Sequence, residues 1–133
     1  MFKNAPVVAV LPAANINETK KFYQDKLELQ AIDAPTPGKD VYFKAGKETY
    51  LYLYERKAGT KADHTVASFI VDDIEKAVED LQGKGVTFEQ YDAPGLKTDE
   101  HGIADLERGS KAAWFKDPEG NILALTEPPV PLS

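Results

Sequence analysis

The sequence predicts an α+β fold of two βαβββ modules, which together form a curved, cavity-enclosing sheet with the helices outside. Two observations support this prediction. In the segment 111–127, KAAWFKDPEGNILALTE, two apolar runs flank an Asp-Pro-Glu-Gly turn, and this pattern indicates a β-hairpin. The same stretch occurs earlier in the chain, where Trp114-Phe115-Lys116 matches Tyr42-Phe43-Lys44 without a gap, at an offset of 72 positions.

The front parts of the two modules also match, at a smaller offset of 58, which aligns Val8 with Val66 and Ile16 with Ile74. Because the offset grows to 72, the extra residues of the second module fall in the polar segment 92–110. One helix cannot cover a module's sheet alone, so we expect one domain over residues 1–133. It divides into module one (about 7–55), a polar linker (56–64) and module two (about 65–127).

The first module begins with a short apolar run, which predicts a buried strand that ends at Pro12. Asn15 is the expected N-cap of a helix, and Glu18 would close a capping box with it. The helix carries one apolar face at 3.6-residue spacing. A strand at Leu29–Ile32 and a hairpin at Val41–Ala45 and Glu48–Glu55 complete the module.

The second module repeats this order. Thr65–Val71 predicts a strand, and Asp72 or Asp73 is the N-cap of a helix whose apolar stripe is followed by glycines. Val86–Tyr91 predicts a strand, and the segment 92–110 predicts a long polar loop. The closing hairpin described above is the last element of the module.

Composition limits the classes of function. The 133 residues carry a net charge of −6 and are 42% hydrophobic, which is typical of a folded soluble protein. An acidic surface repels phosphate backbones and anionic lipids, so we expect neither a nucleic acid nor a membrane as partner. The chain has no cysteine, which excludes a disulfide and a thiolate metal ligand and favours a cytoplasmic location.

Three stretches give the chain a family resemblance: NINETKKFY at 15–23, ASFIVDDIEKAV at 67–78 and WFKDPEGNILAL at 114–125. Together with the internal repeat, they resemble the vicinal oxygen chelate superfamily, which includes glyoxalase I, extradiol dioxygenases, and bleomycin and fosfomycin resistance proteins. The resemblance covers nearly the whole chain. It implies the fold but not one function, because the superfamily has many.

The resemblance also implies where a metal would bind. Enzymes of the superfamily hold a divalent ion with residues of the first and fourth strands of each module, and these positions fall on Val8, Tyr52, Val66 and Ala124. None of the four is His, Gln, Glu or Asp, although hard divalent ions need oxygen or imidazole donors. We therefore expect no metal and no other cofactor, as in the ligand-sequestering members.

Strand alternation predicts which side chains line the cavity. Trp114 is placed among them by the hairpin pairing, and it falls where the extradiol enzymes have a substrate-contacting Tyr. The alternative is that these aromatic residues fill a collapsed core. The expected lining is Val8, Tyr42, Tyr50, Tyr52, Tyr54, Val66, Ser68, Trp114 and Ala124, with Val10, Ile122 and Thr126 on the same faces.

Two histidines are further ligand-binding candidates. His64 has the same parity as Val66 and would lie at the mouth of the cavity as a base or hydrogen-bond partner, or else be an exposed linker residue. His101 lies in the long loop beside Asp99 and Glu100. Consecutive loop residues seldom converge on one metal ion, so a lid over the site or plain surface is the better interpretation of this loop.

The expected function is metal-independent binding of a small aromatic or amphipathic molecule in an aromatic-lined cavity, by a glyoxalase/bleomycin-resistance-like homodimer. The alternative is a glyoxalase- or dioxygenase-type enzyme. It would use either an atypical metal site or, without a metal, Tyr52 and His64 as acid and base. The catalytic residues of such an enzyme cannot be named from the sequence.

Overall fold

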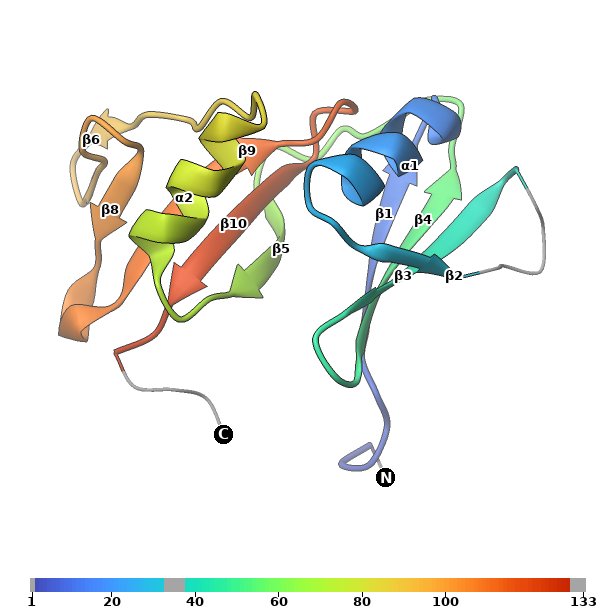
Figure 1. The fold of residues 1–133 in the computed structure, drawn as a ribbon, viewed down its shortest axis with the longest axis horizontal. Helices are drawn as coiled ribbons and strands as arrows, with labels where there is room; N and C mark the ends of the chain where they lie inside the picture. Colours follow the sequence, from blue (N-terminus) through green and yellow to red (C-terminus); the bar gives the residue numbers. More distant parts are fainter. Residues whose placement is uncertain (1, 33–37, 130–133) are drawn as a thin grey trace. The chain divides into compact units, whose positions relative to one another are not determined.

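The computed structural model describes residues 2–32 and 38–129. Its contacts separate the chain into two units, each with a four-stranded sheet and one long helix (Figure 1). Unit 1 comprises Met1–Lys61 with Asp117–Asn121, and unit 2 comprises Ala62–Lys116 with Ile122–Ser133. In both units the first strand lies parallel to the last and the middle strands are antiparallel, so the predicted pair of βαβββ modules is confirmed.

Unit 1 has the strand order β1-β4-β3-β2. Strand β1 continues through Pro12, where the sequence predicted its end. Because β1 is an edge strand, the missing N–H of Pro12 is tolerated there. The elements are β1 (Val8–Ala13), α1 (Ile16–Asp25), β2 (Gln30–Ile32), β3 (Asp40–Ala45) and β4 (Thr49–Glu55).

Helix α1 begins at the predicted cap. The Asn15 side chain accepts a hydrogen bond from the backbone N–H of Glu18 at 3.2 Å and donates one to the Glu18 carboxylate at 3.1 Å. The capping box differs from the prediction in one bond, because the backbone N–H of Asn15 donates to Glu119 instead, at 2.9 Å. The buried stripe of the helix is Ile16, Thr19 and Tyr23.

The turn 117–121 of the last hairpin belongs to unit 1 and completes the helix end. The Glu119 carboxylate accepts hydrogen bonds from the backbone N–H of Ala14 and Asn15 and from the Thr19 hydroxyl, at 2.7–3.0 Å. These donors include N–H groups that a helix start leaves without an internal partner. The turn thus acts as a cap supplied from the far end of the chain.

A second carboxylate of the turn is buried. The Tyr23 hydroxyl donates to Asp117 at 2.7 Å, and the Asn121 side-chain amide donates to Asp117 at 2.8 Å and to the carbonyl of Pro12 at 3.1 Å. Burial raises the pKa of Asp117 above its ordinary value, although hydrogen bonds from Asn121, Tyr23 and the backbone oppose that shift.

Replacing Glu119 with glutamine should change how stability depends on pH. Partial burial would raise the pKa of Glu119, but the hydrogen bonds from Ala14, Asn15 and Thr19 outweigh it, so the pKa is lowered. The charged form therefore stabilises the fold above the ordinary pKa of 4.5, and this contribution is lost as pH falls through the lower, folded-state pKa. The stability difference between wild type and Glu119→Gln, from urea unfolding at several pH values, should shrink below pH 4.5. Glu79→Gln, at an exposed position on the other long helix, is the control, and an equal trend in both variants would contradict the assignment.

Unit 2 has the strand order β5-β10-β9-β8. Its helix is capped by Asp73, not Asp72, and the Asp73 side chain accepts from the backbone N–H of Lys76 at 3.2 Å. The elements are β5 (Thr65–Ile70), α2 (Ile74–Gly83), β6 (Asp92–Ala93), β7 (Leu96–Lys97), β8 (Ile103–Asp105), the short 3₁₀ helix η1 (Glu107–Gly109), β9 (Lys111–Lys116) and β10 (Ile122–Glu127).

The segment 86–110 corrects the sequence prediction. The expected strand Val86–Tyr91 is reduced to a single bridge between Phe88 and Phe115, while β8, from the supposed loop, pairs with the first half of β9. Two segments pair with the same edge of β9. Strand β8 pairs with Lys111–Ala113, so the segment around Phe88 can pair only near Phe115 and does not extend into a strand. Gly102 (φ +85°) allows the close crossing, since a Cβ there would lie 2.9 Å from Cβ of Phe88.

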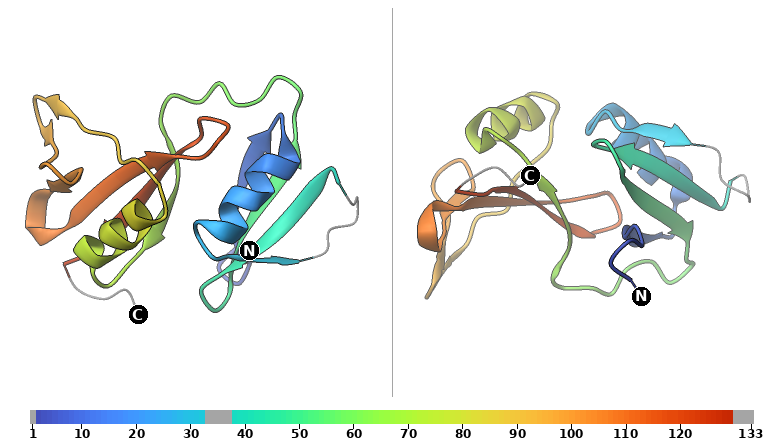
Figure 2. Two further views of the ribbon diagram at one scale, coloured as in Figure 1. Left: turned by 45° about the horizontal axis from the view of Figure 1, so that its top comes forward. Right: turned by 90° about the horizontal axis from the view of Figure 1, so that it is seen from below.

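In each unit the helix lies along one face of its own sheet (Figure 2). The core of unit 1 forms between α1 and the alternate residues Leu11, Phe43, Leu51 and Leu53, all nearly inaccessible to solvent. The core of unit 2 forms in the same way around Phe115 and Leu123. No helix among the described residues has the length and apolar character needed to span a membrane.

Candidate functional site

The face of sheet 1 opposite α1 carries all four of the predicted site tyrosines. Tyr42 and Tyr52 are Cα partners across β3 and β4, with ring centroids 4.6 Å apart. The rings of Tyr52 and Tyr54 are nearly parallel, with an angle of 15° between their planes and 6.3 Å between their centroids. We call this surface the tyrosine face, and it consists of Val8, Val10, Tyr42, Tyr50, Tyr52 and Tyr54.

The tyrosine face is not a collapsed core. Val8, Val10 and Tyr50 are 38%, 54% and 39% exposed, and the other three tyrosines are half-buried. The core beneath α1 is already filled by the residues of opposite parity. The face therefore presents apolar and aromatic area to solvent, as a platform for a flat molecule does.

Asp40 is a candidate site residue that the sequence analysis missed. The Tyr52 hydroxyl donates a 2.7 Å hydrogen bond to its carboxylate, which raises the pKa of Tyr52, with smaller contributions from burial and from the Asp40 charge. The phenol thus keeps its proton and is oriented by Asp40. The available signal was parity, because Asp40 stands two residues before Tyr42 on the same strand and so shares its face.

The corresponding face of sheet 2 carries Trp114. It is the Cα partner of Ala124, which pairs on its other side with Ser68. The Ser68 and Thr126 hydroxyls are hydrogen-bonded at 2.6 Å. Tyr91, another residue that the sequence analysis missed, packs edge-on against the half-buried Trp114, with ring centroids 5.5 Å apart.

The repeat is reflected in this pairing. The offset of 58 relates Val10 to Ser68, and the offset of 72 relates Tyr52 to Ala124. Val10 and Tyr52 are Cα partners in sheet 1, and Ser68 and Ala124 are Cα partners in sheet 2. Val66 coincides with a register shift between β5 and β10, so it has no Cα partner in the ladder. The two faces are thus equivalent in register at this pair but not at Val66, and they differ in chemistry, since one is phenolic and the other carries small residues beside the indole.

His64 lies just before β5, and its side chain is 73% exposed, with Nδ1 3.8 Å from the Asp63 carboxylate. It belongs to unit 2 and Tyr52 to unit 1, and the structure does not test the proposed acid–base pair of these two residues. That pair, and His64 as a ligand contact, stay predictions.

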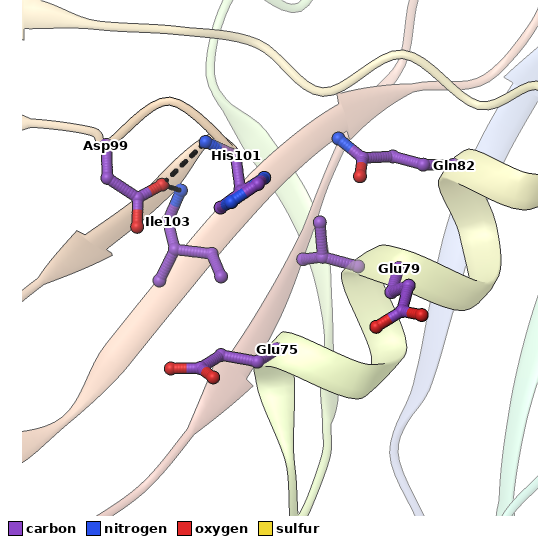
Figure 3. A pocket seen from close by; sticks show the side chains of 7 residues that line it. Glu75, Glu79, Gln82, Asp99, His101 and Ile103 are labelled. Carbon is purple, nitrogen blue, oxygen red and sulfur yellow. Dashed lines mark hydrogen bonds between the residues drawn. The ribbon is translucent and has the colours of Figure 1, made fainter.

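His101 lies on the helix side of sheet 2, away from the tryptophan. It lines a cavity of about 350 Å³ between α2 and the segment 99–103, where Asp99 and His101 face Glu75, Glu79 and Gln82 (Figure 3). The backbone N–H groups of His101 and Ile103 both donate to the Asp99 carboxylate. His101 thus lines a cavity on the helix side of sheet 2. The segment 92–110 forms the separate two-stranded sheet of β6 and β7, strand β8 and η1, and its role as a lid stays a prediction.

The four positions that the resemblance assigns to a metal do not fit one. Val8, Val66 and Ala124 offer only hydrocarbon, and the Tyr52 phenol is hydrogen-bonded to Asp40. Within residues 2–32 and 38–129, no three His, Cys, Asp or Glu side chains are grouped as metal ligands. Function without a metal nevertheless stays a prediction.

Several solved structures share the fold. Lactoylglutathione lyase from Agrobacterium tumefaciens is 21% identical, with a TM-score of 0.70 and coverage of 93% of each chain. TnmS3, an antibiotic-binding protein from Streptomyces, is 20% identical, with a TM-score of 0.68 and coverage of 96% of this chain and 98% of its own. The fosfomycin resistance protein FosX from Listeria monocytogenes is 12% identical, with a TM-score of 0.67 and coverage of 100% and 97%.

No curated protein matches the chain. The family model described as Glyoxalase/Bleomycin resistance protein/Dioxygenase superfamily matches residues 6–125, which is nearly the whole length. The solved structures agree with that match at the level of the fold. The chain therefore belongs to the Glyoxalase/Bleomycin resistance protein/Dioxygenase superfamily.

Proposed function

We propose that this protein binds a small aromatic or amphipathic molecule on its tyrosine face, without a metal, and that it acts by sequestering the molecule. The observation that carries the proposal is the row of partly exposed tyrosines on a face that α1 does not cover. A planar ring stacked on an aromatic side chain gains about 0.5–1.5 kcal/mol beyond the burial of apolar area. The valines beside the tyrosines add area of the same kind.

Solved structures that share the fold include both a binding protein and an enzyme. TnmS3 is by its name an antibiotic-binding protein, whereas the Agrobacterium relative is a lyase. The side chains at the usual metal positions favour binding over metal chemistry, because hydrocarbon side chains cannot ligate an ion.

We further propose that the protein is a symmetric homodimer. Strands β1 and β2 in sheet 1 and β5 and β8 in sheet 2 are edge strands, and folded proteins seldom leave such edges and a broad apolar face bare. A second copy of the chain would cover part of this surface.

Native mass spectrometry of the purified protein tests the three parts together. We expect a mass of two 14.6 kDa chains, no stoichiometric metal, and a mass increase when a planar aromatic compound is bound. Iron, manganese, nickel or zinc near one per chain, lost on chelation together with an activity, would contradict the proposal and favour a lyase or dioxygenase. A 14.6 kDa species at micromolar concentration would contradict the dimer.

A further inference from the structure

Charge is distributed unevenly along the tyrosine face. Strands β3 and β4 place three pairs of Cα partners in successive rows: Lys44 with Tyr50, Tyr42 with Tyr52, and Asp40 with Tyr54. By strand alternation these side chains share one face. The rows therefore run from a lysine at one end to a carboxylate at the other, with phenols between them.

The side chains at the carboxylate end are more buried and in closer contact than the lysine at the other end. Asp40 is half-buried and fixed by the Tyr52 hydroxyl at 2.7 Å, and the Tyr52 ring is flanked by Tyr42 at 4.6 Å and Tyr54 at 6.3 Å between centroids. Lys44 is exposed. We call Asp40 with Tyr42, Tyr52 and Tyr54 the Asp40 corner.

Both components of this corner attract a cation. The faces of aromatic rings carry negative potential, and organic ammonium ions bind over them, most strongly where water is excluded. A carboxylate beside the rings adds a full negative charge, and the chain as a whole carries −6.

The lysine of this face lies far from Asp40. Lys44 is four residues from Asp40 along one strand, about 13 Å at 3.3 Å per residue, which exceeds the Debye length of about 8 Å at physiological ionic strength. Lys39 and Glu55 are neighbours beyond the last row, where the Glu55 N–H donates to the Lys39 carbonyl, and their charges are opposite.

We propose that the ligand of the tyrosine face is a flat aromatic molecule that carries an organic cation, such as a protonated amine, and that its cationic group lies at the Asp40 corner. This inference rests on the proposed function and adds to it the charge and orientation of the ligand. The aromatic body would lie on Tyr42 and Tyr52 and extend toward Tyr50, away from Asp40.

Three probes with one ring system and different charges test it: 2-naphthylmethylammonium, 2-naphthylmethanol and 2-naphthoate, titrated into the intact protein by isothermal titration calorimetry. We expect the ammonium to bind at least about tenfold more tightly than the alcohol, since a cation–π contact and a carboxylate act together, and the naphthoate to bind most weakly. The advantage of the ammonium should shrink at high salt.

Two variants separate a local effect from a general one. Asp40→Asn removes the charge but keeps an oxygen that can accept from the Tyr52 hydroxyl, and it should abolish most of the preference for the ammonium over the alcohol. Asp25→Asn changes the net charge equally at an exposed position of α1, on the other side of the sheet, and should leave the preference intact. Far-ultraviolet circular dichroism and urea unfolding would verify that both variants are folded.

The outcomes distinguish this inference from the proposed function. If all three probes bind equally and Tyr52→Ala weakens all three, the aromatic site stands and the cationic ligand class is wrong. If Asp25→Asn reduces the preference as much as Asp40→Asn does, the cation is attracted by net charge and not by the corner. If none of the probes binds at millimolar concentration, the aromatic site itself is contradicted.

Discussion

Replacing Asp117 with alanine should lower the free energy of unfolding by about 3 kcal/mol, because a hydrogen bond to a charged group contributes about 1.5–3 kcal/mol and several buried donors lose their acceptor together. The Asp117 side chain, only 5% exposed, accepts hydrogen bonds from the Tyr23 hydroxyl, the Asn121 amide and the backbone N–H groups of Glu119 and Asn121. Its loss leaves the fully buried Tyr23 hydroxyl without its acceptor, and an unsatisfied buried donor costs about 1–3 kcal/mol by itself.

The chain contains a matched control for this variant. Asp99 also accepts two backbone N–H bonds within a turn, from His101 and Ile103, but it is exposed. Asp99→Ala should therefore cost about 1 kcal/mol or less, because water can replace the lost acceptor. Urea unfolding followed by circular dichroism measures both variants, and equal losses would show that the buried network contributes no more than an ordinary turn.

Two neighbouring residues of β9 should respond very differently to truncation. Phe115 is fully buried, its ring centroid is 5.4 Å from that of Phe88, and Phe115→Ala should cost about 3–5 kcal/mol, as large core truncations do. Trp114 is half-buried on the opposite face. Trp114→Ala should cost less than half as much, because part of the ring is already in water.

Trp114 also gives a direct readout of its surroundings. It is the only tryptophan of the chain, so its fluorescence reports on the tryptophan-bearing face alone. If a ligand reaches this face, its titration should shift or quench the emission of the wild type. Conversely, a Trp114→Ala variant as unstable as Phe115→Ala, together with an unchanged wild-type emission on ligand addition, would remove Trp114 from the candidate site.

The parts of the fold that follow from local periodicity were predictable. The alternation of Tyr50, Leu51, Tyr52 and Leu53 fixed which side chains face α1 and which face away, since the two-residue period of a strand leaves no other register once one face is buried. The helix caps at Asn15 and Asp73 were equally accessible, because a cap depends on residues within one turn.

The remaining features depend on contacts that local patterns do not encode. Val86–Tyr91 has the composition of a strand, but Ile103–Asp105 competes for the same edge of β9, and a short pattern cannot tell which segment pairs. The bond from Tyr52 to Asp40 required the pairing of β3 with β4 to be known residue by residue. The Glu119 cap links residues about 100 positions apart, with no signal near Asn15 to indicate it.

The distance along the chain between α1 and its distal cap has a consequence for synthesis. At roughly 5–20 residues per second, about 5–20 s separate the translation of Asn15 from that of Glu119. Throughout this interval the N–H groups of Ala14 and Asn15 and the Tyr23 hydroxyl can bond only to water or to temporary partners. The unit that is made first therefore stays incomplete until residues 117–121 have been made, and a nascent chain halted before the final hairpin would display an incomplete N-terminal unit to chaperones and proteases.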